Sequence, residues 1–276
     1  MINMSNEYKE IYPFSKISWE SRKIREKWEP IMTKLGQATH FTEYEMVKRG
    51  FRDCDVYQLN PRSFDVEIDK VAEDKLFYRP ILRSKIYQGF GHRHYPSETI
   101  DENTFIYGVV GKTWEAAEEF KKISTGEVDH KRIGELLGYP ACCSDWFLEV
   151  WLTDGCVDPM FETATNTPTH EVNEDGSVNA YGNPMFNRLL RYWAFQVIPY
   201  FTHSYDCEPS KEFADTWWKI MHEFAPEESE LLLEVLNTKC TWSLNNMIIF
   251  VEHPLFRGCC NGYWYPEKRV VHWVPE

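Results

Sequence analysis

The chain has 276 residues, of which 43% are hydrophobic and 16% aromatic, and its formal net charge is −13. This length and composition fit a globular protein with a full hydrophobic core. The negative charge argues against sequence-independent nucleic-acid binding, which needs a basic surface to displace counterions. No apolar run approaches the roughly 20 residues that cross a bilayer, and the polar first residues lack the apolar segment of a secretory signal. We therefore expect a cytoplasmic protein with no nucleic-acid or membrane partner.

The first part of the chain predicts helices followed by strands. Periodic apolar positions indicate a helix over residues 18–35, ended by the glycine that follows, and a short second helix over residues 42–48. Strands are expected over residues 54–59 and 81–90, because both segments are rich in apolar and β-branched side chains. Residues 61–80 show no pattern that predicts either a helix or a strand.

The clearest strand is the apolar run over residues 104–111, which is bounded by glycine and leads into a helix over residues 114–123 with Thr113 as its N-cap. A strand that feeds directly into a helix is typical of an α/β unit. The turn between them ends in Gly-Lys-Thr, as a phosphate loop does. Only two residues separate its glycines, Gly108 and Gly111, whereas a phosphate loop has four. A nucleoside-triphosphate site is therefore rejected.

Further elements alternate along the rest of the chain. Helices are expected over residues 130–137, 141–152, 184–195, 209–224 and 226–237, and strands over residues 197–201, 247–251 and 269–274. A polar stretch over residues 154–183 predicts a loop of about thirty residues, and loops of that length are usually functional lids or partly disordered. Residues 257–263 have the composition of a turn.

This order of elements predicts an α/β or α+β fold with a mixed sheet, flanking helices and one main core. Residues 1–100 are expected to form an N-terminal helical and strand region that packs on the core. Residues 101–276 are expected to form the α/β core itself and to carry the functional site.

The eight cysteines are Cys54, Cys142, Cys143, Cys156, Cys207, Cys240, Cys259 and Cys260. In a cytoplasmic chain of this size, free thiols and metal ligands are expected rather than a disulfide scaffold. Cys142 and Cys143 fall in the first turn of a helix opened by Pro140, where the partial positive charge of the helix favours thiolates. Cys207 stands where an apolar run gives way to another helix, with Asp206 as the candidate N-cap.

Four thiol and imidazole side chains from these two stretches form a candidate ligand set, namely Cys142, Cys143, His203 and Cys207. Three cysteines and one histidine are the ligands of a structural zinc site, and the same set can hold an iron ion or an iron–sulfur cluster. Thiolates select zinc or iron over magnesium or calcium. His92 and His94 are further candidate ligands, because alternate residues of a strand point to the same face.

Other interpretations of these residues stay open. The cysteines can be small buried residues that only pack. A metal-free nucleophile would need a His–Cys pair, with His203 beside Cys207 or His130 beside Cys142. The vicinal pair at residues 259–260 can be a metal ligand or a redox relay, although packing or chance is the better explanation.

The segments over residues 137–147, 187–191 and 198–208 resemble a family of archaeal and bacterial proteins of unknown function. Its members carry a Gly-Tyr-Pro-x-Cys-Cys motif and, later in the chain, a Cys-Ser-Phe-Asp-Cys motif. The resemblance covers about residues 104–225, and it implies no activity.

Carried over residue by residue, the resemblance implies Cys142, Cys143 and Cys207 as site residues. His203 stands where the family's second motif has its first cysteine, and Tyr205 stands where it has phenylalanine. A histidine in place of a cysteine preserves metal binding but changes the charge and the potential of the site.

Together these observations predict a cytoplasmic metalloenzyme, with oxidoreductase chemistry among the options, that acts on a small molecule or a modified residue. Tyr205, Asp206 and Arg93 are the candidate catalytic or substrate-binding groups. The alternative from a different class is a zinc-stabilised binding module whose abundant Trp and Tyr side chains form a recognition surface.

Overall fold

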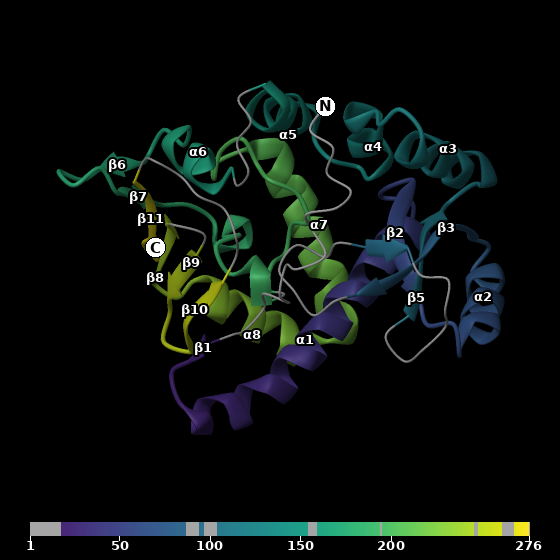
Figure 1. Ribbon diagram of the computed structural model, residues 1–276, viewed down its shortest axis with the longest axis horizontal. Coiled ribbons are helices and arrows are strands. Elements are labelled where there is room, and N and C mark those ends of the chain that lie inside the picture. The colour runs from purple at the N-terminus through teal and green to yellow at the C-terminus, as the bar shows by residue number, and fades with distance from the viewer. Residues whose placement is uncertain are drawn as a thin grey trace.

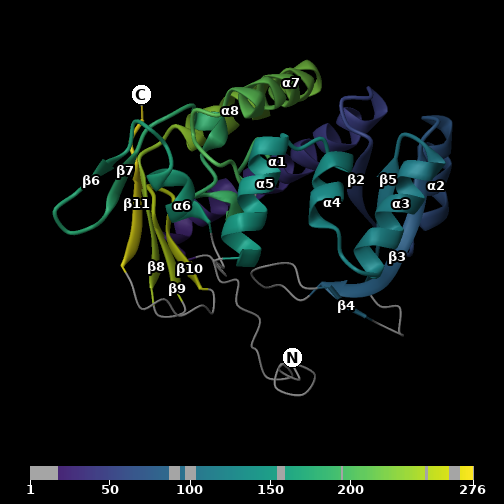
Figure 2. The same cartoon turned by 90° about the horizontal axis from the view of Figure 1, so that it is seen from above.

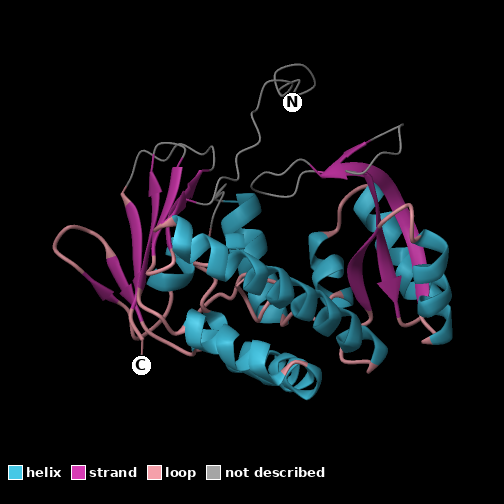
Figure 3. Cartoon of the chain, turned by 90° about the horizontal axis from the view of Figure 1, so that it is seen from below, coloured by secondary structure: helices cyan, strands magenta, loops and turns pink. Residues whose placement is uncertain are grey.

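Two β-sheets lie at opposite ends of the molecule, with helices between them, as Figure 1 shows. The computed structural model describes residues 18–86, 94–96, 104–153, 159–193, 195–245, 248–260 and 268–275. Figure 3 separates the two sheets by colour from the helices that join them. The predicted combination of helices with a mixed sheet is confirmed.

The smaller sheet has four antiparallel strands in the order β2-β5-β3-β4. Its strands are β2 (Cys54–Leu59), β3 (Phe77–Ile86), β4 (His94–Pro96) and β5 (Thr104–Gly111), and its helices are α2 (Phe64–Glu73), α3 (Trp114–Thr125) and α4 (His130–Leu136). The predicted N-cap of α3 is confirmed, because the Thr113 hydroxyl oxygen accepts a hydrogen bond of 3.1 Å from the Ala116 N–H. The division of the chain near residue 100 stays a prediction, and it falls between β4 and β5 of this one sheet.

The larger sheet has seven strands in the order β1-β10-β9-β8-β11-β7-β6. These strands are β1 (Ser18–Trp19), β6 (Glu171–Val172), β7 (Val178–Ala180), β8 (Cys240–Asn245), β9 (Ile248–Glu252), β10 (Phe256–Cys260) and β11 (Arg269–Trp273). The pairing of β11 with β7 is parallel, and the other pairings among the described strands are antiparallel. The turn expected over residues 257–263 is wrong for its first four residues, which lie in β10.

The middle layer contains α1 (Arg22–Lys48), α5 (Ala141–Leu148), α6 (Met160–Thr165), α7 (Glu208–Phe224) and α8 (Pro226–Leu236). A π-helical turn (Glu149–Thr153) continues α5, and Figure 2 shows α1 running beneath α7 and α8. The main core lies between these helices and the larger sheet. Four of its largest side chains are almost fully buried tryptophans, namely Trp193, Trp217, Trp242 and Trp273. None of the described helices is long and apolar enough to cross a bilayer.

The break predicted after residue 35 is wrong, because α1 runs through Gly36 as one helix of 27 residues. A glycine inside a helix costs about 1 kcal/mol relative to alanine. That cost is small beside the burial of the helix on α7, where Leu35, Ala38 and Met46 enter the main core. Tertiary packing therefore outweighs the local stop signal.

The helix and strand predicted over residues 184–201 are also wrong. This segment contains two short 3₁₀ turns, Pro184–Phe186 and Arg191–Trp193, and an irregular stretch that follows them. Its apolar residues are buried in the main core without regular periodicity, and the buried Asn187 side chain takes over backbone hydrogen bonding by donating to the Leu236 carbonyl at 2.7 Å. The loop predicted over residues 154–183 is likewise wrong in part, because it contains α6, β6 and β7.

Candidate metal centre

A tight turn between α4 and α5 positions the two adjacent cysteines. Gly138 ends α4 with φ at +72°, and the Tyr139 N–H then donates to the Gly134 carbonyl at 2.8 Å. This hydrogen-bond pattern is the usual C-terminal cap of a helix with glycine in the left-handed region. The Pro140 carbonyl next accepts from the N–H groups of Cys143 and Ser144, each at 3.0 Å, and so begins α5. The Gly-Tyr-Pro part of the motif therefore sets the direction of α5.

The third cysteine lies at the start of α7. Cys207 is the N-cap residue of that helix, so the prediction of Asp206 as the N-cap is wrong. The Asp206 carboxylate instead accepts a short hydrogen bond from the Ser204 hydroxyl, and its side chain is exposed. Both α5 and α7 thus present their N-terminal ends to the same place, where the partial positive charge of each helix favours thiolates.

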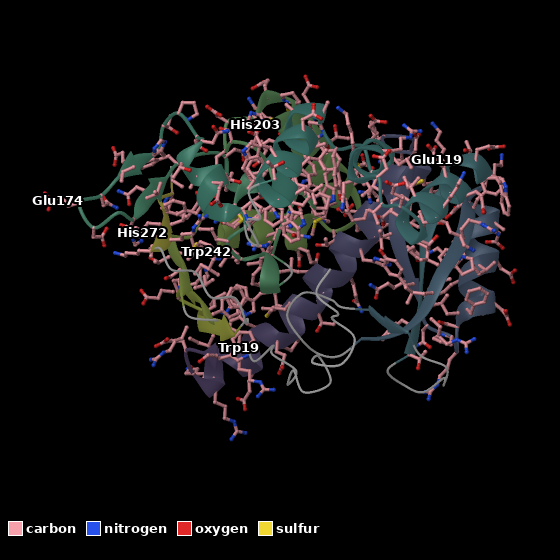
Figure 4. The ribbon with its side chains drawn as sticks, turned by 45° about the horizontal axis from the view of Figure 1, so that its top comes forward. Trp19, Glu119, Glu174, His203, Trp242 and His272 are labelled. Atoms are coloured by element: carbon pink, nitrogen blue, oxygen red, sulfur yellow. The ribbon has the colours of Figure 1, made fainter. Side chains whose placement is uncertain are left out.

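The four predicted ligands come together in one cluster. Cys207 Sγ lies 3.8 Å from Cys142 Sγ and 3.6 Å from Cys143 Sγ. His203 Nδ1 lies 3.4 Å from Cys143 Sγ. One ligand atom from each residue lies within 4.8 Å of every other. His203, labelled in Figure 4, lies among the helices of the middle layer.

The surroundings of the three thiols shift their pKa values in different directions. The pKa of Cys207 is lowered to about 5, because the Cys143 thiol and the Ser210 hydroxyl donate hydrogen bonds to its sulfur, although burial opposes this. The hydrogen bond to Cys207 and then burial raise the pKa of Cys143. Burial, followed by the contact with Cys207, raises the pKa of Cys142. The arrangement thus favours the thiolate at Cys207 over the thiolates at Cys142 and Cys143.

Exposure differs sharply across the cluster. Cys143 and Cys207 are 1% and 3% exposed, His203 is half-buried, and Cys142 is exposed. The two buried sulfurs belong to the main core, and Ser210 from the first turn of α7 packs on them with its Oγ 3.3 Å from Cys143 Sγ. The cluster therefore has a rigid buried side and one ligand at the surface.

Side chains of α6 and of the two residues that follow it hold the histidine segment in place. Thr163 Oγ1 donates to the Thr202 carbonyl at 2.8 Å, and Asn166 Nδ2 donates to the His203 carbonyl at 2.7 Å. Thr167 Oγ1 accepts from the Tyr205 N–H at 2.9 Å. Part of the stretch predicted as a loop therefore supports the site.

The remaining predicted site residues make other contacts or fall outside the residues that the structure describes. Tyr205 is buried, with its ring edge-on to Trp273 at 5.2 Å between centroids. His94 lies in β4, where the structure describes the backbone alone, and His92 and Arg93 fall outside the described residues. Their roles stay predictions.

A partly open cavity of about 230 Å³ adjoins the cluster. It lies between α4, α5 and residues 199–201, and Cys143 is part of its lining. Sequence reasoning did not find this cavity or Ser210. The spacing of Ser210, one helical turn after Cys207, is a signal that could have identified the hydroxyl.

Comparison with protein-family models, with curated proteins and with solved structures finds no match to this chain. The candidate function therefore rests on the site.

Proposed function

We propose that the Cys₃His cluster binds one transition-metal ion, in the first place zinc, and that the protein is a metal-dependent enzyme acting on a small molecule or a modified residue. The observation that carries the proposal is the spacing of the ligand atoms. With bonds of about 2.3 Å to sulfur and about 2.0 Å to nitrogen, a tetrahedral zinc site separates two sulfurs by about 3.8 Å and a sulfur from a nitrogen by about 3.5 Å. Three of the six separations here are close to these values, at 3.6 and 3.8 Å between sulfurs and 3.4 Å from sulfur to nitrogen, and all four residues offer ligand atoms within 4.8 Å of one another.

The same spacing supports a single ion over an iron–sulfur cluster. In a cluster the four ligands are divided between two or more iron atoms that sulfide bridges hold apart, so ligand atoms on different irons lie farther from one another than the corners of one tetrahedron. All four ligand atoms here lie within 4.8 Å of one another. A single iron ion would have nearly the same geometry, and the soft thiolates favour either metal over magnesium or calcium.

Two features support a catalytic role. Cys142 is exposed, so the site has one ligand that solvent can reach. Cys143 lines the adjoining cavity, so a molecule bound there would lie against a ligand sulfur. Thiolates are the nucleophilic form of cysteine, and an exposed ligand can give up its coordination position to a substrate, as catalytic sites require.

A zinc-stabilised binding module is the second candidate, and a specific observation favours it. Four protein ligands complete a tetrahedron, as they do in structural zinc sites. The ligands also join α5 to α7, which lie far apart in the sequence. In that case the ion would contribute folding free energy and no chemistry.

Elemental analysis and a visible spectrum of anaerobically purified protein test the proposal. We expect about one zinc or iron ion per chain and no acid-labile sulfide. Cys207→Ser should lose the ion, whereas Cys240→Ser, a matched buried thiol in β8, should keep it. Stoichiometric sulfide with iron would replace the single ion by a cluster, and full metal retention in Cys207→Ser would sink the ligand assignment.

Metal removal then separates the two candidate functions. If the chelated protein keeps its circular dichroism spectrum but loses turnover, the enzyme is supported. If it unfolds, the structural role is supported. Inactivation by alkylation in a protein that never held metal would revive the plain thiol enzyme.

A further inference from the structure

The cavity beside Cys143 has a mainly apolar lining. Ile133 of α4, Phe147 of α5 and the aromatic residues Tyr139, Tyr200 and Phe201 supply most of its surface. Within the described part of the chain, no lysine, arginine or carboxylate side chain lines it. Apart from the imidazole of His130, the described lining offers a charged group no partner of opposite charge to offset its lost hydration. The lining therefore favours an uncharged group.

The aromatic walls are held in place by ring contacts among the lining residues and by Arg188, which is not part of the lining. Tyr139 and Tyr200 lie 4.5 Å apart between ring centroids, and the parallel rings of Phe147 and Phe201 lie 6.0 Å apart. The guanidinium group of Arg188 lies 4.6 Å from the Phe201 ring centroid. A preformed wall of this kind lowers the entropic cost of binding a flat, rigid group.

The volume sets the size of that group. An apolar cavity of about 150 Å³ accommodates benzene. The cavity here has about 230 Å³ and is partly open, so it has room for a substituted ring or two fused rings. A small aliphatic group would leave much of this space unfilled and forfeit contact energy.

We propose that this cavity binds an uncharged aromatic group of bicyclic size, which belongs to the substrate of the metal centre and brings the attached atoms to Cys143. This inference rests on the proposed function for its link to the metal. The binding of the ring itself depends on the cavity alone. His130, half-buried and part of the lining, is the group available to hydrogen-bond a polar substituent.

Calorimetric titration of the full, zinc-loaded chain with two probes of the same size tests the inference. The probes are 2-naphthol, which is uncharged at pH 7, and 2-naphthoate, which carries a carboxylate on the same rings. We expect 2-naphthol to bind and 2-naphthoate to bind at least about tenfold more weakly. Absence of 2-naphthol binding, or equal affinity for the anion, would overturn the inference.

Two isoleucine variants locate the binding. Ile133→Phe fills the cavity and should weaken 2-naphthol binding by about tenfold or more. Ile123→Phe is the matched control, because Ile123, like Ile133, is half-buried against the hydrophobic cluster that contains Val109 and Phe120 but, unlike Ile133, does not line the cavity. It should leave affinity within about twofold. Unchanged affinity in Ile133→Phe would place the probe elsewhere and overturn the inference. Should that variant not fold, Ser144→Met fills the cavity from α5 instead.

Failure of the inference and failure of the proposed function give different results. If the protein holds one zinc ion but its 2-naphthol affinity is unchanged in Ile133→Phe, the metal site is supported and the proposed role of the cavity is refuted. If the protein holds no metal but its 2-naphthol affinity falls in Ile133→Phe, the role of the cavity is supported and the metal site is refuted.

Discussion

The sulfur atoms of Cys143 and Cys207 lie 3.6 Å apart, although 64 positions separate the two residues in the chain. This contact joins the first turn of α5 to the N-cap of α7. A metal ion bound there would cross-link two helices that otherwise meet through core packing and through the contact of Ser210 Oγ with Cys143 Sγ. Its positive charge would balance thiolates that must be ionised to bind it.

Chelation is therefore expected to lower the stability of the metal-loaded protein. A ligand present at a thousandfold excess over its dissociation constant stabilises the native state by about 4 kcal/mol. Thermal unfolding with and without a zinc chelator, followed by circular dichroism, measures the loss. Cys207→Ser should show no chelator effect, and an equal drop in that variant would mean that the chelator acts elsewhere.

The hydrogen bonds that Thr163, Asn166 and Thr167 make to the histidine segment should be needed for metal affinity. Thr167→Val removes the acceptor of the buried Tyr205 N–H, which costs about 1–3 kcal/mol when the donor is left unsatisfied. Because Tyr205 lies between the ligands His203 and Cys207, we also expect weaker zinc binding in competition with a chromophoric chelator. Thr165→Val is the matched control, since its hydroxyl bonds only carbonyls of its own helix. Equal zinc affinity in the two variants would mean that the hydrogen bond from the Tyr205 N–H to Thr167 does not contribute to metal binding.

The turn before the cysteines should not tolerate a side chain at Gly138. An alanine there would adopt φ near +72° and place its Cβ 2.9 Å from Arg52 Cβ. Arg52 cannot easily move, because it is buried in ion pairs with Glu43 and Asp55. The left-handed backbone alone costs about 1–2 kcal/mol. We expect Gly138→Ala to lower the free energy of unfolding by more than this amount.

Gly176→Ala is the matched control for that variant. Gly176 has φ near +80° but no atom within 4 Å of the added Cβ, so it carries the backbone cost without the steric one. Urea unfolding of both variants measures the difference. Equal destabilisation would mean that the contact with Arg52 contributes nothing.

Much of the site was predictable because its signals are local. The glycine, proline and adjacent cysteines of the first stretch lie within one turn and one helix start, and the second stretch has the same form. Strands such as β2 and β5 and the capped helix α3 were predictable for the same reason.

The parts that sequence reasoning missed depend on distant contacts. Helix α1 continues through Gly36 because its later residues pack into the main core. Residues 195–201 lie in that core as an irregular segment, so their apolar character suggested a strand that does not form. The cavity is made by residues from α4, α5 and this irregular segment. The spacing of residues along the sequence does not show that these three segments meet in space.

Acid should destabilise the protein partly through His253. This histidine is buried, its Nδ1 accepts a hydrogen bond from the Leu255 N–H at 3.2 Å, and burial lowers its pKa to about 4. A folded-state pKa below the unfolded value of about 6.5 means that protons bind the unfolded chain more tightly. The stability associated with neutral His253 is therefore complete above pH 6.5 and is lost as the pH falls toward 4. The loss is on the order of 3 kcal/mol, from about 1.4 kcal/mol per pKa unit.

His253→Asn tests this contribution, because asparagine keeps an acceptor for Leu255 but does not titrate. Urea unfolding between pH 4 and pH 8 gives the free energy of unfolding of the variant and of the wild type. Their difference removes every other titrating group from the comparison, because those groups are common to both proteins. We expect the difference to move in favour of the variant as the pH falls from 6.5 to 4 and to stay flat above 6.5. A difference independent of pH would mean that His253 titrates alike in the folded and unfolded states, so that its burial carries no proton linkage.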